Sequence, residues 1–172
     1  MSSKRTLNLI IILVFLLSLL PGGQPTHAAT VSVTTTFDVN DGDTSSIDNL
    51  IAVPGPDGEI SLREAIIAAN NTSGPDTIGF ELPDDDWHYD GLSGVWTITP
   101  NQALPPLSGG GTSINGYTQE GASEATADSP ASLVVEISGL IVLANNGINI
   151  TSAENVIRGL VINNFPMNGI AI

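Results

Sequence analysis

A pentapeptide that recurs at a fixed interval constrains this chain more than any other feature. The residues Asn146-Gly-Ile-Asn-Ile150 return as Asn168-Gly-Ile-Ala-Ile172, a step of 22 residues. Short Ile- and Val-rich strands that recur at such a step, with Asn and Gly at the corners, are typical of a solenoid whose repeats stack on one another. The repeat predicts inward-facing Ile side chains at each level and Asn side chains that stack at the bends.

The same step predicts which strands are neighbours. It places residues 134–136 over residues 156–158, which would bring Glu136 close to Arg158, because adjacent coils lie about 4.8 Å apart. The alternating residues 157–162 predict a single strand. A β-sandwich is the alternative architecture, although the turns of a sandwich are not expected to repeat a pentapeptide in phase.

The N-terminal residues have the pattern of an export signal. Two cations precede an apolar run over residues 7–20, and a Pro-Gly-Gly turn and a stretch of small residues follow it. This order predicts a secretory signal peptide over residues 1–28, cleavage after Ala28 or Ala29, and a secreted or cell-surface location. The run is shorter than the roughly 20 apolar residues of a membrane span, so an uncleaved anchor is the less favoured alternative. After cleavage the sequence predicts no membrane span.

Charge and cysteine content exclude several functions. Loss of Lys4 and Arg5 with the signal leaves two arginines against 18 carboxylates, a net charge of -16. So acidic a chain has no basic surface for phosphates, which excludes nucleic acid as a partner and makes anionic membranes unfavourable. The sequence contains no cysteine, so disulfides, zinc-thiolate sites, iron-sulfur clusters and thiol nucleophiles are excluded.

Between the signal and the repeat, local patterns predict one helix and several strands. Ser61 and Glu64 match a capping box, in which each side chain binds the backbone amide of the other. The box predicts a helix over residues 62–69 that ends near residues 70–71. A catalytic Arg63–Glu64 pair is the alternative, but adjacent helical residues do not face each other, so we expect structural roles. Alternating β-branched segments predict strands at residues 30–37, 76–81, 95–99 and 112–116.

The first of two acidic loops resembles the start of a calcium site. Carboxylates and amides at alternate positions can converge on a hard cation, and the candidates here are Asp38, Asn40, Asp41 and Asp43. The pattern departs from an EF-hand, because Gly42 occupies a ligand position and no Glu follows at the twelfth position. An Asx-rich turn is therefore the favoured interpretation, and calcium is the one cofactor left open.

The second acidic loop, residues 83–94, places carboxylates around aromatic rings. Its consecutive aspartates are candidates for a cation site, and its rings are candidates for stacking on a sugar whose hydroxyls bind the carboxylates. The favoured alternative is a solvated loop whose tryptophan folds back on the protein, because charge runs usually face water. The residues concerned are Asp84, Asp85, Asp86, Trp87 and Tyr89.

The residues around the predicted helix resemble a known family. Residues 59–70, Glu-Ile-Ser-Leu-Arg-Glu-Ala-Ile-Ile-Ala-Ala-Asn, followed by Asp-Thr-Ile-Gly-Phe at residues 76–80, resemble the CSLREA domain at the N-terminus of exported bacterial β-helix proteins. The segments 114–119, 134–137, 156–163 and 168–170 resemble the first coils that follow that domain. The family commonly has two cysteines near the positions of Thr44 and Ile60, which this chain lacks.

The resemblance implies a mainly β protein, a right-handed parallel β-helix. Residues 29–116 would form the N-terminal cap with one short α-helix, and residues 117–172 the first coils. We also expect further coils after Ile172, because a stable array wants at least three coils and a polar terminal cap. The activity of the family is undefined, so no catalytic residue is carried over.

Two functions follow from these expectations. The first is a non-catalytic exported or cell-surface protein with an adhesive, structural or carbohydrate-binding role, whose partner is a polysaccharide or the cell envelope. The second is the N-terminal part of a polysaccharide lyase or glycoside hydrolase whose active-site coils lie beyond Ile172. A hydrolase needs two carboxylates that face each other across a sugar. The visible coils offer only Glu136, Glu154 and Arg158, so the first function is favoured.

Overall fold

The computed structural model describes residues 28–172, so the predicted signal peptide lies outside the described residues except for Ala28. This part of the chain is mainly β, as predicted. No helix in it is long and apolar enough to span a membrane. The strands are β1 (Thr30–Val33), β2 (Thr77–Phe80), β3 (Tyr89–Asp90), β4 (Val95–Ile98), β5 (Ser113–Asn115), β6 (Val135–Ser138), β7 (Ile148–Asn149), β8 (Val156–Arg158), β9 (Val161–Asn163) and β10 (Ile170–Ala171). The helices are α2 (Ile47–Ala52), α3 (Leu62–Asn71) and a 3-10 turn, η1 (Gly116–Thr118).

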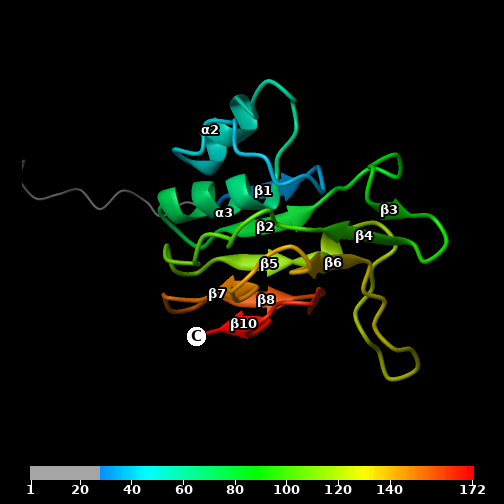
Figure 1. The fold of residues 1–172 in the computed structure, drawn as a ribbon. Coiled ribbons are helices and arrows are strands. Elements are labelled where there is room, and N and C mark those ends of the chain that lie inside the picture. The colour runs from blue at the N-terminus through cyan, green and yellow to red at the C-terminus, as the bar shows by residue number, and fades with distance from the viewer. Residues whose placement is uncertain (1–27) are drawn as a thin grey trace, which may run out of the picture.

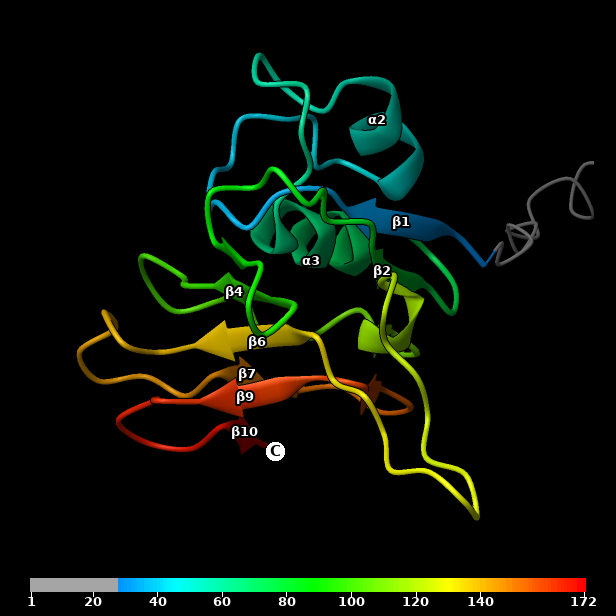
Figure 2. The ribbon, with the colours of Figure 1, turned by 90° about the vertical axis from the view of Figure 1, so that its right-hand side faces the viewer.

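The strands form three sheets whose members are stacked in layers (Figure 1). Their orders are β1-β2-β5-β8, β3-β4-β6-β9 and β7-β10. Every pair is parallel except the β3–β4 hairpin. From β5 onward the chain visits the first, second and third sheets in turn, and β8, β9 and β10 then repeat that order. Figure 2 shows β4, β6 and β9 one above another.

The third sheet carries the 22-residue step. Ile148 pairs with Ile170, and the backbone amide and side-chain amide of Asn168 both donate hydrogen bonds to Asn146 Oδ1 over 3.1 Å. These contacts agree with the predicted step and with the predicted stacking of Asn side chains. The stacking of the two layers also explains the glycine of the pentapeptide. A Cβ on Gly147 would overlap the carbonyl oxygen of Gly169 in the next layer. Only glycine therefore lets the corners of the two layers approach this closely.

The other two sheets do not follow the step of 22, and the predicted pairing of residues 134–136 with residues 156–158 is wrong. Glu136 pairs with Val161 in the second sheet, whereas Arg158 pairs with Asn115 in the first. Residues 157–162 are likewise two strands rather than one. Gly159, whose φ of 71° lies in the left-handed region, turns the chain between them.

The separated residues find other partners. Glu136 Oε1 accepts a hydrogen bond from Asn163 Nδ2 over 2.6 Å. Arg158 forms an exposed ion pair with Glu124, and its guanidinium lies 5.4 Å from the centre of the Tyr117 ring. The expected proximity of Glu136 and Arg158 therefore does not occur. The turn at Gly159 places β8 in the first sheet and β9 in the second, so Arg158 and the partner of Glu136 belong to different sheets.

The interior of the stack is filled by apolar side chains of the strands before β8 and of α3. These side chains are almost wholly buried and come from both large sheets, from β7 and from α3. They include Ile66, Ile78, Phe80, Ile98, Ile114, Ile137 and Ile148. Burial of such side chains stabilises the fold by about 1.5–3 kcal/mol each. The predicted inward-facing Ile of the repeat is found at Ile148, whereas its equivalent in the last layer, Ile170, is 43% exposed.

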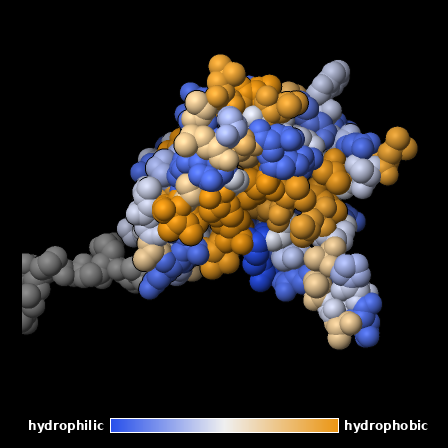
Figure 3. Space-filling view, turned by 60° about the horizontal axis from the view of Figure 1, so that its bottom comes forward, coloured by the Kyte–Doolittle hydropathy of each residue, from blue (hydrophilic) through white to orange (hydrophobic). Residues whose placement is uncertain are grey.

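The two ends of the stack differ. Helices α2 and α3 pack beside β1, and the β3 hairpin covers the edge of β4. At the opposite end, β8, β9 and β10 are the last strands of their sheets, and no other element of residues 28–172 covers them. Figure 3 brings this end forward and shows broad apolar surface there. Val156, Met167 and Ile170 are exposed at this end.

Candidate functional site

The first acidic loop is bound to the rest of the protein through Asp38. Both oxygens of Asp38 accept hydrogen bonds from Arg63, each over 2.8 Å, and the two side chains are 3% and 8% exposed. Arg63 also donates to the carbonyl oxygens of Gln102 and Ala103. Asp38 is therefore the partner of a buried arginine, and its geometry is that of a structural ion pair rather than an open cation ligand.

Glu64 organises the same loop from the other side. Its Oε2 accepts a hydrogen bond from the Ser61 amide over 2.9 Å, which completes the capping box of α3. Its Oε1 accepts hydrogen bonds from the amides of Asp41 and Gly42, each over 2.8 Å. The Glu64 side chain is buried and both of its oxygens accept backbone hydrogen bonds, so we assign it to the support of this loop.

The remaining candidates in the first loop point to local structure. Asp43 Oδ1 accepts hydrogen bonds from the amide and hydroxyl of Ser45, and these bonds lower the pKa of Asp43. Loss of solvation, followed by the charges of Asp57 and Glu64, raises the pKa of Asp41. Asn40 is exposed. Among residues 28–172, no group of three or more His, Asp or Glu side chains is arranged to hold a metal ion.

The second acidic loop is anchored by Asp86. Its Oδ2 accepts a hydrogen bond from the Thr36 amide over 3.0 Å, and its Oδ1 accepts hydrogen bonds from the Thr36 hydroxyl and the His88 amide. Because the single Thr36 hydroxyl proton goes to the carboxylate, His88 Nδ1, 2.8 Å from Thr36 Oγ1, must donate to that oxygen. Asp84 and Asp85 are exposed, so the three consecutive aspartates do not converge.

We expect Asp86 to make stability depend on pH in the acidic range. Burial by itself raises the pKa of Asp86, but the hydrogen bonds from Thr36 and the His88 amide outweigh burial and hold the pKa below its ordinary value. A carboxyl with a lowered pKa in the folded state stabilises that state above the unfolded pKa of about 3.9. Its contribution is lost as pH falls through the folded pKa.

The measurement is the midpoint of urea unfolding between pH 5 and 2, for the wild-type chain and Asp86→Asn. The variant should lose stability at pH 5 and show a flatter decline towards pH 2. An exposed aspartate provides the matched control, since Asp85→Asn should follow the wild-type curve. Parallel curves for the wild-type chain and Asp86→Asn would contradict the assignment.

Trp87 does not fold back on the protein, so that expectation was wrong. Its side chain is 83% exposed. The reason lies in its two neighbours. Asp86 is bound to Thr36, and His88 packs edge-to-face on Phe37 with ring centres 5.0 Å apart. With both neighbouring side chains held against the body of the protein, the residue between them points outwards.

Tyr89 takes a different position from Trp87. Its ring stacks on that of Trp96, with centres 4.3 Å apart and planes inclined by 26°. Trp96 is itself buried, and its indole N–H donates to the carbonyl oxygen of Pro83 over 2.9 Å. The two aromatic candidates of this loop therefore do not form one platform: Trp87 is a free outer ring, and Tyr89 belongs to a fixed stacked pair.

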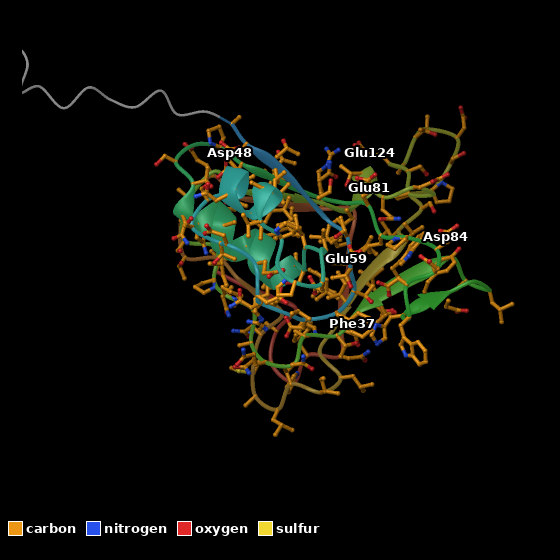
Figure 4. The ribbon with its side chains drawn as sticks, turned by 90° about the horizontal axis from the view of Figure 1, so that it is seen from above. Phe37, Asp48, Glu59, Glu81, Asp84 and Glu124 are labelled. Atoms are coloured by element: carbon orange, nitrogen blue, oxygen red, sulfur yellow. The ribbon has the colours of Figure 1, made fainter. Side chains whose placement is uncertain are left out.

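The stacked pair lines an open cleft of about 380 Å³ between the β3–β4 hairpin and the loop after η1. Its polar lining residues are Asp84, Ser93, Glu120 and Ser132, and the Ser93 hydroxyl donates a hydrogen bond to Asp90. A second cleft of about 360 Å³ shares Glu120 and is also lined by Glu81. Figure 4 shows Glu81 and Asp84 on the same side of the molecule, seen from above.

Hydrogen bonds made by the side chains of Thr118 and Gln119 fix the walls of these clefts. The Gln119 side chain, 3% exposed, accepts a hydrogen bond from the Leu82 amide over 2.7 Å and donates one to the Leu82 carbonyl oxygen over 3.0 Å. Thr118 Oγ1 accepts a hydrogen bond from the Phe80 amide over 2.7 Å. Residues 80–82 and 118–119 are thereby joined, which places Glu81 and Glu120 along the same cleft.

Reasoning from the sequence did not find Glu81, Glu120 or the clefts. Within residues 28–172, neither of these two glutamates forms an ion pair. The cleft combines the ring of Tyr89, two serines and exposed carboxylates, and its walls are held together by the hydrogen bonds of Gln119. This combination suits the binding of a polyhydroxylated ligand.

A comparison of this chain with protein-family models, curated proteins and solved structures finds no match.

Proposed function

We propose that this chain belongs to an exported or cell-surface protein with a non-catalytic, carbohydrate-binding role in adhesion. Its scaffold in this proposal is a right-handed parallel β-helix, with a cap that resembles the CSLREA domain followed by the first coils. The signal-like N-terminus and the strong negative charge support export. The repeated order of strands through three parallel sheets supports the scaffold. The exposed apolar end supports the stacking of a further coil on β8, β9 and β10.

The single observation that carries the binding role is the cleft over Tyr89 and Trp96. One face of a sugar ring presents C–H groups that pack on an aromatic surface, and its hydroxyls donate hydrogen bonds to carboxylates. The cleft supplies both, with Tyr89 in its lining and Asp84 and Glu120 as acceptors. Its volume of about 380 Å³ lies in the range of small-ligand sites.

Trp87 is an exposed aromatic ring in the same loop that contributes Asp84 and Tyr89 to the cleft. A large aromatic ring that is 83% exposed is a hydrophobic surface without a partner inside the protein. Trp and Tyr are enriched where proteins bind ligands and partners, because they contribute a large contact area with few rotatable bonds. In the proposal, the Trp87 ring offers the glycan an aromatic contact outside the cleft, and no metal ion is required.

The proposal is tested with the full chain and a panel of soluble neutral and acidic polysaccharides. Binding is followed by the fluorescence of the two tryptophans, of which Trp87 is exposed and Trp96 is buried. We expect Glu120→Ala and Trp87→Ala each to weaken binding about tenfold, equivalent to about 1.4 kcal/mol. Matched controls are Asp128→Ala, an exposed acid outside both clefts, and Leu92→Ala, whose exposed apolar side chain lies beyond β3.

Each outcome of this experiment decides part of the proposal. Failure of every polysaccharide to bind the wild-type chain would overturn the carbohydrate role. Equal losses in the test variants and in their controls would show that binding does not use the cleft or Trp87. Shortened or unsaturated oligosaccharides after incubation would overturn the non-catalytic assignment and favour the lyase or hydrolase.

A further inference from the structure

Ala29 is held at the start of the first sheet by two hydrogen bonds. Its backbone amide donates to Asp76 Oδ1 over 3.1 Å, and its carbonyl oxygen accepts from the Thr77 amide over 2.8 Å. Ala29 and Asp76 are 8% and 1% exposed, and they immediately precede β1 and β2. The first buried backbone nitrogen of the described chain therefore lies against a buried carboxylate.

This geometry separates the two cleavage positions that the sequence leaves open. Cleavage after Ala29 would remove both of these hydrogen bonds and withdraw a donor from the buried Asp76 carboxylate. Cleavage after Ala28, which is exposed, keeps both bonds and converts the Ala29 amide nitrogen into a chain terminus. Withdrawal of a donor from a buried charged group is costly. The folded structure is therefore compatible with cleavage after Ala28 and opposes cleavage after Ala29.

We infer that a signal peptidase hydrolyses the Ala28–Ala29 bond and that the new α-ammonium group of Ala29 forms a buried ion pair with Asp76. This inference rests on the export that the proposed function includes. Water adds across the peptide bond, which leaves a carboxylate on Ala28 and an amino group on Ala29. That amino group binds a proton at neutral pH, because an α-amino group ordinarily titrates near pH 8.

Processing then strengthens a contact that already exists. An amide that donates to a carboxylate becomes an ammonium group that donates to the same carboxylate, and a hydrogen bond between two ionised groups is shorter and stronger than one with a neutral donor. The pair joins the residue before β1 to the residue before β2. The mature chain is therefore expected to be more stable than its precursor, with its first strand fixed by its own terminus.

The first test identifies the terminus. The full chain is produced in a bacterium with an active export pathway, and the extracytoplasmic protein is examined by intact mass and N-terminal sequencing. A terminus at Ala29 is the expected result. An exported protein that begins at Thr30 or at Ala28 would overturn the inference while export itself stands. Uncleaved chain retained in the cytoplasm would instead overturn the export on which the inference rests.

The second test measures the ion pair without relying on a variant. Among the described residues, Asp76 is the one titratable side chain that hydrogen-bonds to Ala29. A carboxylate partner makes the folded state hold the ammonium proton more tightly than the unfolded state does, so the stabilisation is complete below pH 8 and is lost as pH rises further. The melting temperature of the processed chain should fall by about 3–8 °C between pH 7 and 10.

The precursor provides the comparison, because it has an amide at this position and should lack that fall. In the processed chain, Asp76→Asn should remove the fall, and Asp48→Asn, which changes an exposed aspartate on α2, should keep it. If Asp76→Asn does not fold, the precursor and the processed chain still decide the question. Identical pH profiles for these two forms would overturn the ion pair.

Discussion

Replacing Glu64 with alanine is expected to lower the free energy of unfolding by about 3–5 kcal/mol. Glu64 is 1% exposed, and its carboxylate accepts hydrogen bonds from the backbone amides of Asp41, Gly42 and Ser61. Alanine would leave these three donors without their acceptor, and the Ser61 amide lies in the buried interior. The loop before α2 and the first turn of α3 would lose their shared support.

The measurement is urea unfolding at pH 7, followed by far-ultraviolet circular dichroism. Glu120→Ala is the matched control, because Glu120 is exposed and makes no side-chain hydrogen bond within residues 28–172, and its effect should stay within about 0.5 kcal/mol. Glu64→Gln should lie between the two, since it keeps one acceptor oxygen. Equal stability of Glu64→Ala and Glu120→Ala would refute the role given to Glu64.

Replacing Arg63 with methionine is expected to cost about 3–5 kcal/mol. The arginine forms two hydrogen bonds with Asp38 and two with backbone carbonyl groups, and both charged side chains are buried. Methionine keeps much of the side-chain volume but leaves the Asp38 charge without its cation. The double variant Arg63→Met with Asp38→Asn should recover part of the loss, because the unpaired charge is then absent.

Arg158 offers a control from the same chain. Its ion pair with Glu124 is exposed on both sides, so Arg158→Met should cost no more than about 1 kcal/mol. Limited proteolysis adds a local readout, since loss of Arg63 should release the loop at residues 38–43 from the connector at residues 101–103. A loss for Arg63→Met no larger than that for Arg158→Met would contradict the buried pair.

Local patterns were sufficient for the elements whose determinants lie within a few residues. The capping box at Ser61 and Glu64 places the start of α3, and alternating β-branched residues place β2 and β4. Helix α2 escaped prediction because it has six residues and offers only Ile47 and Leu50 to the core. So short a helix depends on packing, which a local pattern does not contain.

Partners that lie far apart in the sequence were not predictable in the same way. The clefts exist because Gln119 binds the backbone of Leu82, 37 positions away, and so aligns Glu81 with Glu120. The many carboxylates of the acidic loops suggested a metal site. In the structure, however, Asp38 accepts hydrogen bonds from an arginine, and Asp86 accepts them from backbone amides and a hydroxyl. Composition shows how many carboxylates a loop has and leaves open what each one binds.

The contrast between the two ends of the stack gives the molecule a direction. Helices and a hairpin block the edge that carries β1 and β4, whereas β8, β9 and β10 offer backbone groups and apolar side chains for pairing. Among residues 28–172, the strand edges that are open to a further strand therefore lie at one end of the stack. Mutual repulsion opposes contact between copies at neutral pH, and this protection disappears near the isoelectric point of about 4.1.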